Sequence, residues 1–167
     1  MTVQLTSEQV WQVIEKELFA VLGMVTARQE ARTVGIVYVV RGRRLYIASG
    51  KDTWKVKHIA QNSDVSLTVP IHKGIPLMPW FKIPAATITF AGQARVLDPK
   101  ETDPETLKAL YRGMAEDETL MADSVVIEVI PEGKFLTYGV GVSLMDMRDP
   151  AKSRGSAPVG VSAPQRA

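Results

Sequence analysis

Hydrophobic and polar residues alternate with a period of two along much of the chain, which predicts β-strands. Residues 65–69 contain the clearest case, because Val65, Leu67 and Val69 alternate with Ser66 and Thr68. Residues 85–97 repeat the pattern, and residues 32–40 are apolar on both faces, which favours a central strand. Further strands are predicted at residues 24–28, 45–49, 124–131 and 134–142, the last two forming a hairpin around Glu132 and Gly133.

Helical periodicity occupies three other stretches. Val10, Ile14 and Leu18 form an apolar stripe at helical spacing, which predicts a helix from Thr6 or Ser7 to Gly23. A short helix is predicted from Asp52 or Thr53 through Ile59, with Asn62 as its stop. A third begins at Asp103 and Pro104 and buries Leu107, Leu110, Tyr111 and Met114.

These elements predict a mainly β (α+β) protein: a six- to seven-stranded, mostly antiparallel barrel with helices packed outside it. We expect one domain over residues 1–144. A flexible tail is predicted over 145–167, which is rich in Pro, Gly, Ser and Ala. Residues 70–84 hold four prolines and the pair Trp80-Phe81, which favours a constrained loop that forms a ligand lid, a subunit contact or a plug for the barrel.

Composition narrows the function classes. The chain has 167 residues, a net charge of +2 and no cysteine, so thiolate metal sites and cysteine nucleophiles are excluded. Its two histidines lack a recognisable ligand spacing, so no metal site is predicted. No stretch resembles a signal peptide or a membrane span, and we expect a soluble, cytoplasmic protein with no membrane partner. Nucleic-acid binding is the lowest-ranked hypothesis, and we expect no nucleic-acid partner, because no aromatic residues interleave with the basic cluster Arg41, Arg43, Arg44, Lys51, Lys55 and Lys57.

The candidate chemistry lies in residues 45–69, which read as strand, turn, basic helix and strand. Lys51 and Lys55 stand at the start of the helix, where the helix dipole disfavours cations and favours anions. A phosphate would resolve this conflict by accepting hydrogen bonds from backbone amides, from Ser49 and Thr53, and from Lys55. The alternative is a connector helix whose lysines are solvated.

The same stretch resembles the signature of the pyridoxamine 5′-phosphate oxidase-like, FMN-binding split-barrel family. The resemblance covers roughly residues 8–142. Arg32, before the central strand, and Gly92 match two further family positions. The matching residues of the signature are Ser49, Thr53, Trp54, Lys55, Ile59, Asn62, Val65, Ser66 and Leu67.

The resemblance implies a split β-barrel homodimer with FMN between its subunits. It implies a phosphate site of Arg32, Ser49, Thr53 and Lys55, with Trp54 beside it. The backbone at Thr33, Val34, Gly35 and Val37 would run under the isoalloxazine ring. Trp80, Phe81 and Thr87 would cover that ring from the partner chain.

Three departures from the family pattern bear on the substrate. Trp54 replaces the signature arginine, which removes a bidentate phosphate partner. Thr87 replaces a glutamine that touches the flavin, and the chain lacks the arginine-containing end that grips the vitamin phosphate. We therefore expect an FMN-dependent oxidoreductase acting on a small molecule other than pyridoxamine phosphate. No catalytic side chain is predicted, because the flavin would carry the chemistry. The alternatives are a non-catalytic flavin or haem carrier, with His72 near the haem, and a deazaflavin-dependent reductase.

Overall fold

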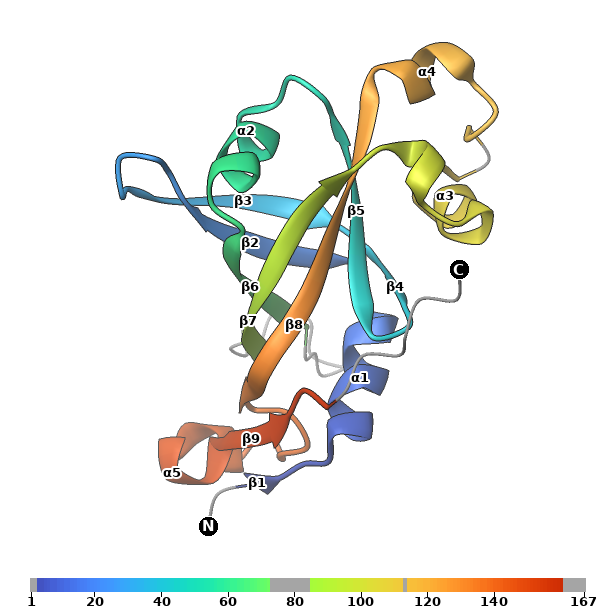
Figure 1. Cartoon of the computed structure of the whole chain (residues 1–167). Helices are drawn as coiled ribbons and strands as arrows, with labels where there is room; N and C mark the ends of the chain where they lie inside the picture. The colour runs from blue at the N-terminus through green and yellow to red at the C-terminus, as the bar shows by residue number, and fades with distance from the viewer. Residues whose placement is uncertain (1–2, 73–84, 113, 161–167) are drawn as a thin grey trace, which may run out of the picture.

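The computed structural model describes residues 3–72, 85–112 and 114–160, and its framework is one nine-stranded sheet (Figure 1). Six strands of seven or more residues carry the architecture: β2 (Phe19–Val25), β3 (Ala31–Val37), β5 (Arg44–Gly50), β6 (Asp64–Ile71), β7 (Ala86–Leu97) and β8 (Ser124–Tyr138). Three short strands extend it: β1 (Val3–Gln4), β4 (Val39–Arg41) and β9 (Arg154–Pro158). The α-helices are α1 (Ser7–Lys16), α2 (Trp54–Gln61), α3 (Pro104–Tyr111), α4 (Glu118–Ala122) and α5 (Pro150–Ser153), with 3₁₀ turns at Pro99–Glu101 and Asp146–Arg148.

The six long strands form an antiparallel series in the order β5, β8, β7, β6, β2, β3. The two end strands of this series approach each other. No ladder joins β3 to β5 within the residues that the structure describes, so the barrel stays open along one seam. The prediction of a mainly β split barrel with flanking helices is confirmed, and the additional strands are the three short ones.

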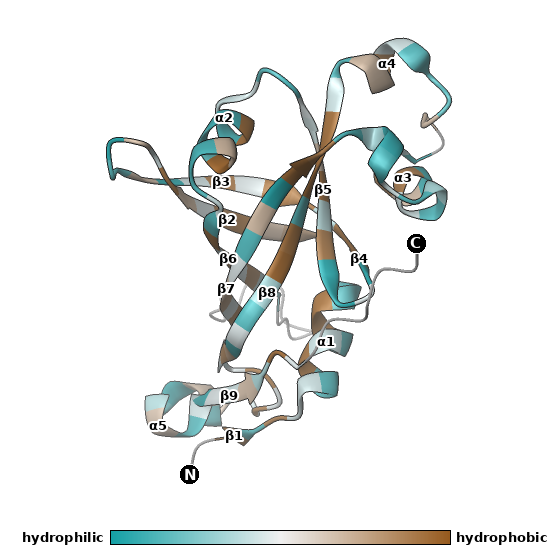
Figure 2. Cartoon of the chain, in the orientation of Figure 1, coloured by the Kyte–Doolittle hydropathy of each residue, from teal (hydrophilic) through white to brown (hydrophobic). Residues whose placement is uncertain are grey.

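The core lies between the inner faces of these strands. Leu22, Leu67 and Ile88 are fully buried on neighbouring strands. Trp11 of α1 closes one end, where its ring packs edge-on against Phe135 with centroids 5.3 Å apart. Figure 2 shows hydrophobic residues concentrated in the strands and hydrophilic ones on α5 and on the β2–β3 connection.

The local structure predicted for residues 45–69 is confirmed. Thr53 is the N-cap of α2 and Asn62 its C-cap. On β6, Val65, Leu67 and Val69 are buried, as their alternation predicts. Just before this stretch, β4 and β5 form a hairpin in which Arg41 pairs with Arg44.

The first helix ends earlier than its apolar stripe predicts. The helix α1 stops at Lys16, and β2 begins at Phe19. Ala20, Leu22 and Met24 are buried in alternation, so strand pairing with β3 and β6 overrides the helical spacing of Leu18, which is exposed.

The predicted hairpin over residues 124–142 is wrong. β8 runs continuously through Glu132 and Gly133, where Gly133 adopts a φ of +69° and the register with β7 shifts. A positive φ suits glycine because it has no Cβ. The shift allows one edge of β8 to pair first with β5 and then with β9.

The predicted central position of residues 32–40 is also wrong, because β3 ends the strand series and lies at the seam. Val37 is 57% exposed on it. The second apolar face of β3 is therefore not covered by other residues in the described part of the chain.

The predicted flexible tail is wrong for residues 146–158. They form a 3₁₀ turn, α5 and β9, and β9 pairs with β8 and with β1. The following residue, Val159, accepts hydrogen bonds from Ser7 Oγ (2.8 Å) and Trp11 Nε1 (3.0 Å) through its carbonyl. Alternating small residues, Gly155 and Ala157, allow this strand to lie against the core in spite of its low hydrophobicity.

Candidate functional site

A cleft of about 300 Å³ lies in the open seam of the barrel, and we call it the seam cleft. Residues 35–39 form one wall, and Ile47 and Ala48 of β5 form the opposite wall. Lys55 of α2 and Ala109, Leu110 and Arg112 at the end of α3 complete it. Its size lies at the lower end of the range for small-molecule sites, about 300–1,000 Å³.

Two cations line the seam cleft without a counter-ion. No ion pair within residues 3–72, 85–112 and 114–160 involves Lys55 or Arg112. Arg112 ends α3 in the left-handed conformation, with φ 48° and ψ 45°. Because opposite charge favours binding in a partly enclosed site, the cleft is suited to an anionic ligand.

The two hydroxyls predicted to bind phosphate lie beside Lys55. Ser49, the last residue but one of β5, is buried, and its Oγ lies 2.9 Å from Thr53 Oγ1. Thr53 Oγ1 donates to the Gly50 carbonyl at 3.0 Å and makes no capping hydrogen bond to the amides of α2. The structure therefore brings Ser49, Thr53 and Lys55 together at the start of a helix whose first-turn amides lack a side-chain cap.

Arg32 lies apart from these three residues. It borders a second hollow of about 290 Å³ between the start of β3 and α2, which we call the β3–α2 hollow. Its guanidinium contacts Glu30 Oε2 at 3.0 Å, and both side chains are about half exposed.

Only two of the four predicted flavin-facing positions line the seam cleft. Gly35 and Val37 line it, whereas Thr33 and Val34 lie earlier on β3 and are not part of the cleft lining. A Cβ at Gly35 would lie 2.8 Å from Phe19 Cε2, so the glycine makes room for that ring. Trp54 is exposed on α2.

The residues expected to come from a partner chain are not brought to the cleft within one chain. Thr87 is half-buried on β7, opposite Pro70 and Tyr138, and does not line the cleft. Trp80 and Phe81 lie outside the described residues. His72, considered for haem, is exposed just after β6.

Sequence reasoning missed the contribution of α3 to the site. Leu110 and Arg112 reach the seam cleft from a helix that is distant in sequence from residues 45–69. The dipeptide Arg112-Gly113 could have indicated a helix end with an exposed cation, but the helix was expected to continue to Met114. A third hollow, of about 510 Å³, shares Leu18, Tyr38 and Ala109 with the cleft and continues it towards α1.

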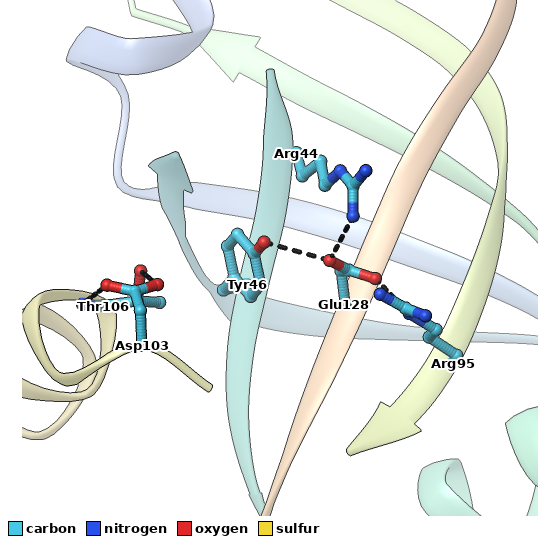
Figure 3. A network of polar contacts seen from close by, with 6 residues as sticks. All are labelled: Arg44, Tyr46, Arg95, Asp103, Thr106 and Glu128. Atoms are coloured by element: carbon cyan, nitrogen blue, oxygen red, sulfur yellow. Dashed lines mark hydrogen bonds and ion pairs between the residues drawn. The ribbon is translucent and has the colours of Figure 1, made fainter. Parts of the chain in front are cut away.

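A buried ionic network lies outside these hollows, at the base of α3 (Figure 3). Glu128 of β8 is fully buried and contacts Arg44 at 2.9 Å, Arg95 and the Tyr46 hydroxyl at 2.9 Å. Burial alone raises the pKa of Glu128, but hydrogen bonds from Arg95, Arg44 and Tyr46 lower it below its usual value. Burial and the nearby Glu128 raise the pKa of Tyr46 to about 12, so its hydroxyl stays protonated as a donor at neutral pH.

The fold and the seam cleft together define a split-barrel protein with a cleft lined by two cations. The sequence profile of the family described as pyridoxamine 5′-phosphate oxidase matches residues 6–137, and the chain belongs to this family. No curated protein matches the chain in sequence.

Solved structures agree with the fold. A heme binding protein from Mycobacterium smegmatis has a TM-score of 0.67 and 14% identity; the match covers 95% of this chain but only 60% of the other. A protein described as an F420 reductase has a TM-score of 0.54 and 22% identity, covering 74% of this chain and 93% of the other. A FAD-binding protein from Mesorhizobium loti has a TM-score of 0.59 and 15% identity, covering 77% and 89%. At these identities the likeness establishes the fold alone.

None of the helices within the described residues has the length and apolar character needed to cross a membrane.

Proposed function

We propose that this protein is a flavin-dependent oxidoreductase that binds FMN in the seam cleft. The observation that carries the proposal is that two cations, Lys55 and Arg112, line a cleft whose other lining residues are mostly apolar. Ser49 and Thr53 do not line the cleft themselves, but their paired hydroxyls lie at the start of the helix that carries Lys55. A flavin mononucleotide has matching chemistry, since it joins a dianionic phosphate to a flat, largely apolar ring system. Membership of the family supports flavin binding.

The residues present fit the phosphate end. Lys55 would pair with the phosphate, and the first-turn amides of α2 would donate hydrogen bonds to it. The Ser49 and Thr53 hydroxyls would donate to it as well by turning from the Gly50 carbonyl, which both of them contact in this structure. The Gly35 backbone, Ile47 and Ala48 would flank the ring and restrict water. When bound, the flavin supplies the capacity to accept and return a hydride or electrons.

We further propose that the protein works as a homodimer whose subunits cover the cleft. Leu18, Phe19 and Val37 are 60%, 47% and 57% exposed. Phe19 and Val37 face each other across β2 and β3, and Leu18 and Val37 both line the cleft, so the three form one apolar patch at its mouth. A large aliphatic and aromatic patch beside a ligand site is typical of a protein interface.

Haem and the deazaflavin coenzyme are the alternative ligands, since structures of similar fold include a heme binding protein and an F420 reductase. The visible spectrum of the purified protein, recorded before and after adding FMN and desalting, separates them. We expect flavin absorption that survives desalting. A Soret band would overturn the flavin proposal in favour of haem, and a colourless protein that retains no added FMN would direct the test to the deazaflavin coenzyme.

Lys55→Ala should weaken FMN binding by about 1.5–3 kcal/mol, the contribution of a hydrogen bond to a charged group, or roughly tenfold to 100-fold in Kd. The measurement is quenching of flavin fluorescence on titration of the apoprotein. Lys57→Ala is the matched control, because Lys57 lies on the same helix but is exposed and lines none of the three hollows. Equal FMN affinities in the two variants would show that Lys55 does not hold the phosphate.

A further inference from the structure

We infer that the β3–α2 hollow and the exposed Trp54 beside it form a site for an adenosine diphosphate group, so that the protein prefers FAD to FMN. This inference rests on the proposed function, because it extends the same flavin site along α2. It assigns a ligand to side chains that neither the core nor the seam cleft uses.

The hollow is lined by groups that suit a phosphorylated ligand. Thr26, Arg28 and Arg32 border it from the β2–β3 connection and the start of β3, and His58 and Gln61 border it from α2. These side chains offer two guanidinium groups, an imidazole, an amide and a hydroxyl. The single carboxylate in the lining belongs to Glu30.

The two arginines of the β3–α2 hollow are available to bind an anion. In the described ranges no carboxylate pairs with the Arg28 side chain. Arg32 pairs with Glu30, but an exposed pair of this kind contributes little to stability. Arg32 can therefore exchange Glu30 for a phosphate at small cost, and guanidinium groups bind phosphate oxygens in a bidentate manner.

An aromatic surface lies next to these cations. Trp54 is 45% exposed, and its ring packs edge-on against His58 with centroids 5.6 Å apart. Residues 54, 58 and 61 follow the i, i+4, i+7 spacing of one helix face, which carries the aromatic surface to the hollow. An exposed indole face beside guanidinium groups is the arrangement that stacks on a nucleobase while cations hold its phosphates.

The position of α2 connects this surface to the flavin site. Lys55, in the first turn of α2, lines the seam cleft, and His58 and Gln61, one and two turns later, line the hollow. A ligand whose first phosphate lies at Ser49 and Lys55 can therefore extend its second phosphate and purine along the exposed face of α2. FMN ends at its single phosphate and leaves this surface without a ligand.

The test compares FAD, FMN and free ADP on the apoprotein by isothermal titration calorimetry. We expect FAD to bind more tightly than FMN, and Trp54→Ala and Arg28→Ala each to lower the FAD affinity, relative to the FMN affinity, by about fivefold to 100-fold, the scale of one base stack or one charged contact. Lys57→Ala is the control for charge on α2 and should leave the ratio of the two affinities unchanged. Thermal unfolding of each variant confirms that it folds.

The ADP titration shows whether the β3–α2 hollow binds the adenosine diphosphate group of FAD or a free nucleotide. ADP that competes with both FAD and FMN supports a site for the adenosine diphosphate group of FAD, because one of its phosphates would then occupy the position of the FMN phosphate. ADP that binds equally well with FMN in place would overturn the inference in favour of a separate site for a free nucleotide. Equal FAD and FMN affinities, with no ADP binding and no effect of either variant, would overturn the inference. If the flavin proposal itself is wrong, the result differs: neither FMN nor FAD binds, whether or not ADP binds.

Discussion

At the scale of single residues, the most constrained side chain is Glu128. It is fully buried, and its oxygens contact two arginines and a tyrosine from β5 and β7. Burying a carboxylate without partners would be costly, so the three contacts are what make its position possible. The same contacts hold together strands β5, β8 and β7 on the side where α3 packs (Figure 3).

Glu128→Gln should lower the free energy of unfolding by about 3 kcal/mol, because it removes the charge that compensates Arg44 and Arg95. Chemical denaturation with urea measures this. Glu30→Gln breaks the exposed pair with Arg32 and should cost less than about 1 kcal/mol. Similar losses in both variants would show that the buried network does not contribute more than a surface ion pair.

The same carboxylate makes stability depend on pH. The pKa of Glu128 is lowered from 4.5 in the folded state. Asp103 is exposed; partial desolvation raises its pKa, but hydrogen bonds from Thr106 outweigh this and lower it from 3.8. A lowered pKa contributes stability that is complete above the unfolded value and is lost as the pH falls through the folded value. We expect the melting temperature to fall below about pH 4.5, and to fall less steeply in Glu128→Gln. Parallel curves for the two proteins would contradict this.

At the scale of elements, β9 shows how little hydrophobicity a strand needs when its partners are fixed. Its residues alternate between exposed and buried, and Ala157 lies opposite Phe135 of β8. Val159, just beyond it, closes the contact with α1 through the hydrogen bond from Trp11. β9 is thus the link between the first helix and the long strand β8.

Ala157→Asp should destabilise the protein by about 3 kcal/mol or more, since the carboxylate would be buried against Phe135 without a partner. Ser156→Asp, one residue earlier on the exposed face, should change stability by less than about 0.5 kcal/mol. Thermal and urea unfolding of both variants test this. If the two substitutions cost the same, the strand does not bury alternate residues.

At the scale of the whole molecule, the open seam decides where a ligand can bind. β3 and β5 end the strand series and do not pair with each other in the part of the chain that the structure describes. Lys55 of α2 and Arg112 at the end of α3 line the gap between them. The apolar patch of Leu18, Phe19 and Val37 borders the same gap. Site and proposed subunit interface therefore coincide.

Val37→Asp should convert a dimer to a monomer and weaken flavin binding together with it, because it places a charge within the proposed interface. Sedimentation velocity gives the mass, and flavin titration gives the affinity. Met145→Asp replaces another exposed apolar residue outside the patch and should leave both unchanged. A wild-type monomer that binds flavin fully would contradict the dimer proposal.

The sequence by itself determined the elements whose signals are local. Asp103 caps α3 by accepting a hydrogen bond from the Thr106 amide, and Thr53 occupies the N-cap position of α2 without a capping hydrogen bond from its side chain. β6 and β7 follow their alternation because one face of each is buried. The proximity of Ser49, Thr53 and Lys55 was predictable for the same reason, since all three lie within one turn and the helix start that follows it.

Only the tertiary structure decided what depends on distant partners. Residues 19–25 form a strand because β3 and β6 pair with them, and β9 is a strand because β8 and β1 are placed to receive it. Arg32 lies apart from Lys55, and Arg112 lines the seam cleft, because of how β3, α2 and α3 pack around the seam. Strand pairing and side-chain convergence between segments far apart in the chain are set by packing, and neither periodicity nor capping in one segment encodes them.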